Sequence, residues 1–438
     1  MSALAHLEQQ LAGQRQCLLA YSGGLDSTVL LHQLVQLRQR LPDLQLRAIH
    51  IHHGLSPSAD SWVAHCQQQC AAWQVPLVVD YVQLDTHEKG VEAAAREARY
   101  AAFRRHLLTA ESLITAQHLD DQCETFLLAL KRGSGPAGLA AMPQITDFDG
   151  HLLVRPLLTQ PRQQLEQWAQ EHALRWIEDE SNQDTRYDRN FLRQRILPQM
   201  TARWPHFAEA SARSAALCAE QENLIDELLA ESLTQLIQPD GSLCVATFPG
   251  MSEARRSALL RRWVAACGGN MPSRDALQRL YREVIASRED AAPRLRLGAF
   301  EIRRYRGALY WLALQPPVRQ LILAWPDIRQ PLDLPESLGQ LIPGSQGTVL
   351  RLPEKGESVS VRFQAQGHIQ IVGRAGSRPV KKIWQELAIP PWQRERTPLI
   401  FYGEQLVAAP GIFVTRFGEA KNQVGWHVSW RHHNGERQ

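Results

Sequence analysis

The sequence predicts an α/β domain built on a parallel sheet, then a mainly helical domain, then a smaller mixed or β-rich domain. Three observations predict this order. Short apolar runs alternate with helical stretches over residues 1–204, and helical apolar spacing dominates residues 205–314. A proline-punctuated stretch, residues 315–347, is followed by strand-like alternation within residues 348–438. The length of 438 residues is enough for several separate cores.

The first domain is expected to contain four strands and three intervening helices. The expected strands are residues 17–21, 44–52, 76–84 and 111–116, and the expected helices are residues 26–40, 58–73 and 92–108. Strand–helix–strand alternation is typical of a parallel sheet covered by helices. Such sheets bind ligands at the carboxyl ends of their strands. The polar motifs described below follow these strands.

The later domains have weaker but readable patterns. The helical domain, residues 205–314, is expected to close with a hairpin over residues 299–312 that turns near Arg306 and Gly307. Residues 315–347 are expected to be a linker or irregular β structure. In the C-terminal domain, residues 348–438, we expect strands within 348–372 and a short helix over 380–387.

Composition is that of an ordinary globular protein, with 44% hydrophobic and 21% charged residues. No apolar run approaches the roughly 20 residues of a membrane span, and residues 1–16 lack the apolar stretch of a secretion signal. We therefore expect a cytoplasmic protein with no membrane partner. Seven cysteines without any CxxC pair argue against a disulfide framework and against a zinc or iron–sulfur knuckle. The net charge of +3 does not by itself indicate nucleic acid.

The sequence Ser-Gly-Gly-Leu-Asp-Ser, residues 22–27, joins the first expected strand to a helix. Paired glycines let several backbone N–H groups turn inward, and the helix start adds free N–H groups and the positive end of its dipole. This pattern predicts a phosphate site. No lysine follows as in a Walker A loop, and Asp26 would need a magnesium ion between itself and a phosphate. The alternative is a plain turn with Asp26 as a helix-start residue, which accounts for one aspartate and not for the whole motif.

Histidines end the second strand and arginines follow the third. His50 and His52 would share one strand face, so a metal site is one interpretation, and polar lining of a nucleotide pocket is the one we favour. Arg96 and Arg99 would lie on neighbouring positions of one helix face, where they could neutralise charge on a bound phosphate. The alternative is a surface helix with an ion pair between Glu92 and Arg96.

The segment after the fourth strand, residues 115–125, contains His118 and Asp121. A histidine and an aspartate at this end of the sheet could supply base or metal chemistry. Acidic residues at a helix start can also simply complement its dipole. The later glycine-rich stretch, residues 133–139, matches GxGxxG but does not follow a strand, so we interpret it as a flexible loop rather than a dinucleotide site.

The Ser-Gly-Gly-x-Asp-Ser motif after the first strand resembles the pyrophosphate-binding loop of the N-type ATP pyrophosphatases, the PP-loop superfamily with an adenine nucleotide alpha hydrolase-like fold. The resemblance implies that ATP is cleaved between its α- and β-phosphates. AMP would pass to a substrate oxygen, pyrophosphate would leave, and a nucleophile would then displace AMP. The loop residues would hold the phosphates and Asp26 would bind Mg²⁺; these loop residues are Ser22, Gly23, Gly24, Leu25 and Ser27.

Further motifs resemble the tRNA(Ile)-lysidine synthetase family over nearly the whole chain. They are HHGL, GVEAAAREARY, TAQHLDDQCET, RGSGPAGL, RPLL at 155–158, residues 179–193, and residues 373–376, 381–387 and 390–398. One departure is Gln117, where many relatives have histidine. The resemblance implies a ligase that uses ATP to adenylate the C2 oxygen of the wobble cytidine in the isoleucine tRNA with a CAU anticodon. Free L-lysine then displaces AMP, giving lysidine and changing the tRNA's identity from methionine to isoleucine.

The same resemblance implies roles for four side chains. His118 and Asp121 would serve the reacting centre, and Arg96 or Arg99 would stabilise developing charge; the sequence does not divide these roles among them. Another PP-loop enzyme, such as a tRNA thiolase or a small-molecule amidotransferase, and a non-catalytic RNA-binding protein stay open as alternatives. Paired cysteines or a glutaminase domain would favour the first two.

Two basic clusters on the appended domains favour a tRNA partner over two merely solvated faces. They comprise Arg294, Arg296, Arg303, Arg304, Tyr305 and Arg306, and then Arg374, Arg378, Lys381, Lys382, Arg394 and Arg396. We expect the C-terminal domains to distinguish the substrate from the initiator tRNA, which has the same anticodon. A homodimer is one assembly that the sequence leaves open.

Overall fold

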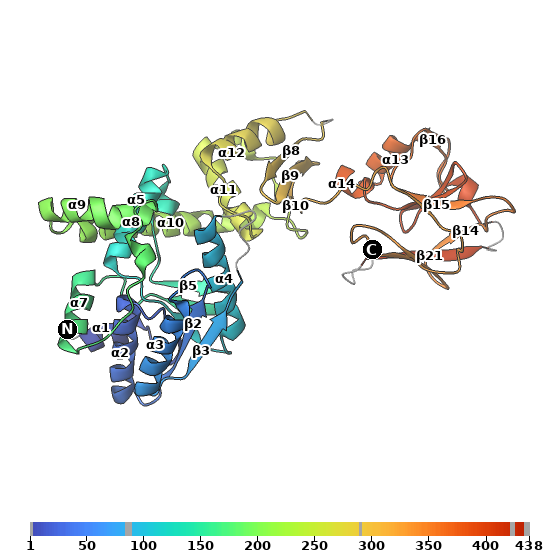
Figure 1. The fold of residues 1–438 in the computed structure, drawn as a ribbon. Coiled ribbons are helices and arrows are strands. Elements are labelled where there is room, and N and C mark those ends of the chain that lie inside the picture. Colours follow the sequence, from blue (N-terminus) through green and yellow to red (C-terminus); the bar gives the residue numbers. More distant parts are fainter. Residues whose placement is uncertain (1–2, 84–89, 289–290, 421–424, 433–438) are drawn as a thin grey trace. The chain divides into compact units, whose positions relative to one another are not determined.

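The computed structural model describes residues 3–83, 90–288, 291–420 and 425–432 (Figure 1). The chain divides into two compact units, residues 1–228 and 229–438. Each unit has its own hydrophobic cores.

The first unit contains a six-stranded sheet in the order β3-β2-β1-β4-β6-β5. Its strands are β1 (Gln16–Ala20), β2 (Gln45–His52), β3 (Leu77–Tyr81), β4 (Ser112–Ile114), β5 (Ile145–Phe148) and β6 (His151–Val154). All neighbours pair in parallel except β5 and β6. The four predicted strands and the parallel sheet are therefore confirmed.

The β5–β6 hairpin was not predicted from the sequence. Each of its strands has only four residues, which is too short for a clear periodicity. The turn at Asp149 and Gly150 has positive φ at both residues, 59° and 82°. An Asp-Gly pair in this conformation is a strong hairpin signal, so the turn was the feature that could have revealed these strands.

Helices cover both faces of this sheet. They include α1 (Ala3–Gln10), α2 (Leu25–Arg40), α3 (Ala59–Ala72), α4 (Val91–His106), α5 (Leu119–Lys131) and α7 (Arg162–Glu171). Within β1, Leu19 belongs to the core cluster that includes residues of α1, α2 and α7, whereas Leu18 belongs to the cluster around Phe103 of α4. Successive side chains of a strand point to opposite faces. Both faces are thus buried, and ligands can reach the sheet only at its edges and ends.

Parallel pairing fixes where the motifs meet. Because β1 and β4 pair in parallel, the loop that precedes α2 and the segment that precedes α5 leave the sheet at the same end. The chain then continues through α8 (Asp188–Phe191), the π-helical turn η2 (Leu192–Ile196), α9 (Leu197–Arg203) and the 30-residue helix α10 (Phe207–Leu236). The division between the two units falls within α10, whereas we expected a boundary at residues 204/205.

The second unit begins with the end of α10 and a helical region. Trp263 of α11 (Glu253–Ala266) lies in one buried cluster with residues of α12 (Arg274–Arg279) and the π-helical turn η4 (Leu280–Ile285). A four-stranded sheet adjoins them, formed by β7 (Leu243–Cys244), β8 (Arg294–Leu297), β9 (Phe300–Tyr305) and β10 (Ala308–Ala313). The predicted hairpin is confirmed: β9 and β10 are antiparallel and turn at Arg306 and Gly307, both with positive φ.

The C-terminal region contains two larger antiparallel sheets and a two-stranded one formed by β16 (His368–Ile369) and β17 (Arg378–Pro379). These strands and the short helix α13 (Val380–Glu386) confirm the predicted β-rich domain. One sheet comprises β11 (Ile322–Ala324), β15 (Val359–Arg362), β18 (Leu399–Tyr402), β19 (Gln405–Ala409) and β20 (Phe413–Val414). The other comprises β12 (Leu332–Asp333), β13 (Gln340–Gly344), β14 (Thr348–Leu350) and β21 (Trp426–Arg431).

Residues 315–347, which we expected to be a linker or irregular β structure, supply three of these strands. β11 pairs with β15, β12 pairs with β13, and β13 pairs with β21. The prolines obscured this. Pro326 and Pro331 lie between strands. Pro343 lies within β13, but β12 pairs only with Gln340 and Leu341, so on that side of β13 residue 343 needs no backbone N–H donor. Among the described residues we find no helix with the length and apolar character that a bilayer crossing requires.

Candidate active site

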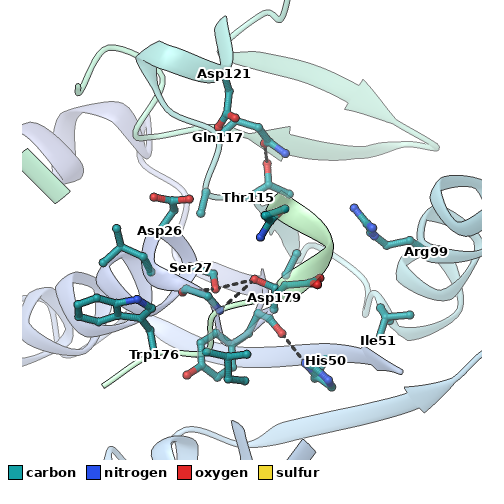
Figure 2. Close-up of a pocket in the computed structure, with 18 of the residues that line it drawn as sticks. Asp26, Ser27, His50, Ile51, Arg99, Thr115, Gln117, Asp121, Trp176 and Asp179 are labelled. Atoms are coloured by element: carbon teal, nitrogen blue, oxygen red, sulfur yellow. Dashed lines mark hydrogen bonds between the residues drawn. The ribbon is translucent and has the colours of Figure 1, made fainter. Parts of the chain in front are cut away.

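A pocket of about 550 Å³ lies at the carboxyl ends of the parallel strands (Figure 2). Its walls come from the loop after β1, the end of β2, α4, the segment after β4, and residues 176–193. Every residue of the Ser22–Ser27 loop except Gly23 lines it, and so do Arg96, Arg99 and Asp121. Tertiary structure thus brings most of the residues predicted from separate motifs to one cavity.

The loop before α2 depends on Gly23. Its φ is +83°, and a Cβ at this position would lie 2.5 Å from Cδ1 of Ile177 and 2.8 Å from Sγ of Cys66. Any other residue would meet both backbone strain and steric overlap. The glycine is therefore required by the close approach of two other segments.

Hydroxyl groups and backbone N–H groups converge inside this loop. The Oγ atoms of Ser22 and Ser27 lie 3.0 Å apart, the Gly24 N–H donates to Oγ of Ser22 at 3.3 Å, and Oγ of Ser27 donates to the Gly24 carbonyl at 3.1 Å. The N-cap residue of the 16-residue helix α2 is Gly24, which has no side chain to cap the helix start. The first N–H groups of α2 and its dipole are thus available to an anion in the pocket.

Asp26 belongs to this loop and lies beside a buried histidine. Nε2 of His118 is 3.6 Å from Oδ2 of Asp26 and 3.3 Å from Oδ2 of Asp121, and its Nδ1 is 3.4 Å from Oδ2 of Asp120. Oδ1 of Asp26 is buried and has no hydrogen-bond partner among the described residues. A buried carboxylate oxygen without a donor is a candidate for cation binding.

These contacts determine the protonation states of His118 and Asp26. Burial alone would lower the pKa of His118, but its three carboxylate neighbours raise the pKa to about 10. Burial alone would raise the pKa of Asp26, but His118, Arg162 and Arg193 outweigh it and hold the pKa below its ordinary value. At neutral pH His118 is therefore an imidazolium and Asp26 a carboxylate. His118 is fully buried and does not line the pocket, whereas Asp26 and Asp121, whose carboxylates it contacts, both do.

Asp121 connects this group to an arginine from far along the chain. Its Oδ2 accepts the backbone N–H of His118 at 3.1 Å, and its Oδ1 accepts from Arg193 at 2.7 Å. Arg193 also donates to both carboxylate oxygens of the fully buried Glu124, at 2.7 and 2.9 Å. Arg193 is held in the π-helical turn η2, a conformation found frequently at functional sites.

The arginines of α4 lie on the opposite wall. Figure 2 shows Arg99 extending from α4 toward the pocket, across from Asp26. Arg96 lies over the ring of Tyr100 at 4.8 Å and donates to its hydroxyl at 3.3 Å. The side chain of Glu92, whose ion pair with Arg96 was an alternative, lies outside the described residues.

The histidines after β2 take different positions. His50 and His53 line the pocket, whereas His52 does not. His50 is buried and its Nδ1 donates to the carbonyl of Tyr21 at 3.0 Å. Across the described part of the chain, no group of three or more His, Cys, Asp or Glu side chains is arranged to hold a metal ion. Gln117, the departure from the family motif, lines the pocket and accepts a hydrogen bond from the Thr115 hydroxyl.

The main element that sequence reasoning left without a role is residues 176–183, which pass over the loop. The backbone N–H of Ile177 donates to the carbonyl of Gly23 at 2.8 Å. Asn190 anchors the far end by donating to the carbonyls of Ser181 and Asp184. The pocket residues to which the sequence assigned no role, some of them within the family motif at 179–193, include Arg162, Trp176, Ile177, Glu178, Asp179, Asn182, Gln183, Arg189 and Arg193. Their polar run from residue 178 was a signal, but nothing local tied it to the first loop.

Comparison with known proteins identifies the family. The chain is 59% identical over 428 residues to the tRNA(Ile)-lysidine synthase of Serratia proteamaculans, with 98% of each chain covered. It is 58% identical over 427 residues to the enzyme of the same name from Shigella flexneri, covering 97% of this chain and 98% of the relative. The chain belongs to the tRNA(Ile)-lysidine synthase family.

Domain families agree with this membership. Residues 2–200 match the PP-loop domain family, residues 243–310 the TilS substrate binding domain and residues 359–430 the TilS substrate C-terminal domain. The predicted tRNA(Ile)-lysidine synthase family and its PP-loop fold are therefore confirmed. Among solved structures, a U34-tRNA thiolase from Methanococcus maripaludis superposes with a TM-score of 0.43 and 15% identity, covering 50% of this chain and 77% of the thiolase.

Proposed function

We propose that this chain uses ATP to join L-lysine to C2 of the wobble cytidine in the CAU-anticodon tRNA(Ile), forming lysidine. Membership of the tRNA(Ile)-lysidine synthase family over nearly the whole chain supports this function. The observation that carries it is the pocket in which the Ser22–Ser27 loop faces acidic and arginine side chains. That pocket has an anion cradle on one wall and groups for an adenylation reaction on the others.

The loop would hold the phosphates of ATP. Its converging hydroxyl groups and the uncapped start of α2 supply hydrogen-bond donors and positive potential. Arg96 and Arg99 would stabilise the charge that develops as the bond between the α- and β-phosphates breaks. AMP then passes to the C2 oxygen of the cytidine and pyrophosphate leaves.

Magnesium fits the residues present. Asp26 has a buried oxygen without a donor among the described residues and a pKa below its ordinary value, so it would offer the ion a negatively charged oxygen. Protein sites commonly bind Mg²⁺ through one or two carboxylates together with substrate phosphates and water. When bound, the ion would neutralise phosphate charge, and His118 would keep the Asp26 carboxylate oriented toward it.

The second step needs a free amine. The lysine ε-amine attacks C2, the bond from C2 to the AMP oxygen breaks, and AMP leaves with the bonding electrons. The amine must lose a proton, and the carboxylates on the pocket wall are Asp26, Asp121, Glu178 and Asp179. We assign Asp121 to this centre because Arg193 and the His118 backbone fix its carboxylate.

Some cations of the two basic clusters have partners within the protein, whereas others are exposed and could contact tRNA. Arg303 pairs with Glu301, and Arg304 donates to carbonyl groups of residues 285, 287 and 288, so these arginines support the fold. Arg374 and Arg378 both pair with Glu386. Lys381 and Lys382 are exposed at the start of α13. We assign phosphate contacts to these two lysines.

A thiolase is not favoured by the cysteines. All seven are free thiols, and burial raises the pKa of Cys66 and Cys70 to about 12. Such thiols are poor nucleophiles at neutral pH.

We place the protein in the cytoplasm, where ATP, lysine and tRNA meet. A homodimer is the assembly that analytical ultracentrifugation would test.

The deciding experiment combines purified protein, ATP, Mg²⁺, labelled lysine and a CAU-anticodon tRNA(Ile) transcript. We expect one lysine per tRNA with release of AMP and pyrophosphate. A transcript with guanosine at the wobble position serves as the control and should take up no lysine. If folded protein that binds ATP never incorporates lysine, the proposed function is wrong.

A further inference from the structure

A second pocket, of about 270 Å³, lies in the second unit between α11 and the α12–η4 segment. These helices pack against each other within the helical region (Figure 1). Leu260 and Leu277 are buried and form its floor. Ser257 and Arg282 contribute to its walls, and Arg282 is exposed. Nothing in the reaction described above uses this groove.

One wall of the groove is a stacked pair. The Arg256 guanidinium carbon lies 3.9 Å from the centroid of the Tyr281 ring. Arg256 is held there because its Nη1 donates to the carbonyls of Met251, at 2.8 Å, and Phe248, at 3.4 Å. A guanidinium fixed over an aromatic ring forms a flat, rigid, positively charged surface.

A polar bridge closes the groove on another side. Nε2 of Gln278 donates to Oε1 of Glu253 at 3.1 Å, which links α12 to α11. The Glu253 carboxylate is therefore engaged by a neighbour, while the cations Arg256 and Arg282 remain on the walls. The groove combines an apolar floor, an aromatic–guanidinium wall and an exposed cation.

We propose that this groove binds one unstacked nucleotide of the tRNA substrate. The inference rests on the proposed function for the RNA itself, and goes beyond it by assigning a contact outside the active-site pocket. Bases of single-stranded RNA are recognised by stacking on aromatic rings and guanidinium planes. The groove has about half the volume of the active-site pocket, a size suited to one base and not to a duplex. The base lies against the stacked pair of Arg256 and Tyr281, and its phosphate contacts Arg282.

The test is tRNA binding by full-length variants. Tyr281→Leu keeps an apolar side chain and removes the ring, and we expect it to raise the Kd for tRNA about tenfold, as loss of one stacked base does. Tyr281→Phe should bind like wild type. Arg282→Gln should weaken binding and reduce its salt dependence. The matched control is Arg279→Gln, on the same helical segment but paired with Glu283 and outside the groove; it should bind normally.

A blocking variant covers the case in which Tyr281→Leu does not fold. Ser257→Phe fills the groove from its wall and leaves the stacked pair in place, so it should weaken tRNA binding as strongly. Full tRNA affinity in folded Tyr281→Leu or Ser257→Phe would overturn the proposal, and so would equal losses in Arg279→Gln and Arg282→Gln.

ATP measurements separate this proposal from the proposed function. We expect the KM for ATP to be unchanged in all groove variants, because the groove lies outside the ATP pocket. If wild-type protein binds the tRNA but forms no lysidine, the function fails while the groove can still be tested by binding. If lysidine forms normally in every groove variant at limiting tRNA, the groove proposal alone fails.

Discussion

The backbone N–H of Ile177 donates a 2.8 Å hydrogen bond to the carbonyl of Gly23, and the Ile177 side chain occupies the space where a Cβ of residue 23 would lie. The phosphate loop is therefore shaped by a segment distant in the chain. That segment also leads to Arg189 and Arg193 on the pocket wall. The same segment therefore supports the Ser22–Ser27 loop at one end and supplies Arg189 and Arg193 to the pocket wall at the other.

Replacing Ile177 by proline should weaken ATP binding. Proline removes the N–H donor while keeping an apolar side chain, and a lost hydrogen bond costs about 0.5–1.5 kcal/mol. We expect the KM for ATP to rise about 3- to 10-fold with a smaller change in the KM for tRNA. Ile177→Val keeps the donor and should behave like wild type. An unchanged KM for ATP in folded Ile177→Pro would show that the bond does not shape the loop.

Gly23→Ala should lower the free energy of unfolding by more than the strain of a left-handed backbone at residue 23 accounts for. A left-handed backbone costs a non-glycine residue roughly 1–2 kcal/mol, and here the Cβ also overlaps Ile177 and Cys66. Gly13→Ala is the matched control, because Gly13 has φ +81° but open space around it. Denaturant unfolding should show a larger loss of stability for Gly23→Ala, and equal losses in both variants would contradict the packing argument.

Asp26→Asn should abolish lysine incorporation without unfolding the protein. The amide cannot supply the negative charge that a magnesium ion requires, so we expect at least a 100-fold loss in kcat/KM. Asp43→Asn is the control, since Asp43 is an exposed aspartate of the same unit that pairs with Arg15. Full activity in Asp26→Asn at low Mg²⁺ would remove the ligand role from this residue.

His118 should make stability depend on pH in the alkaline range. Its pKa is raised from an ordinary value of 6.5 to about 10, so the folded state binds its proton more tightly than the unfolded state does. The resulting stabilisation is complete below pH 6.5 and is lost as pH rises toward 10. Urea unfolding of the wild type should therefore show declining stability across this window, by a few kcal/mol at most.

His118→Gln tests whether the alkaline loss of stability comes from deprotonation of His118. It should be less stable than wild type at pH 6.5, and the difference should shrink as pH approaches 10. His206→Gln, at a largely exposed histidine, should leave the wild-type profile unchanged. If the free energy of unfolding fell in parallel with pH in the wild type and in His118→Gln, other groups would be responsible for the loss of stability at alkaline pH.

Replacing Lys381 and Lys382 together by glutamine should weaken tRNA binding. The slope of log Kd against log salt should fall by up to about two, because each lysine that neutralises a phosphate contributes about one to it. Arg374→Gln is the matched control, because Arg374 is already paired with Glu386. Filter binding at several salt concentrations measures both quantities. An unchanged slope in the lysine variant would place the RNA elsewhere.

The sequence by itself predicted the elements that depend on local patterns. The Ser22–Ser27 loop, the parallel strands around it and the β9–β10 hairpin follow from periodicity and turn chemistry within short windows. The β5–β6 hairpin was missed, and the sequence did not separate strands from a linker within residues 315–347, because prolines and short strands weaken such patterns. Motif resemblance supplied the family, which whole-chain identity then confirmed.

Only the tertiary structure decided the states and partners of the site residues. The sequence placed His118 near the reacting centre, and folding buries it among three carboxylates, outside the residues that line the pocket. Ile177 and Arg193 had no assigned role until folding placed them against Gly23 and Asp121. The physical reason is that a motif determines backbone conformation locally, whereas the charge of a side chain and the space beside a glycine depend on atoms from distant segments.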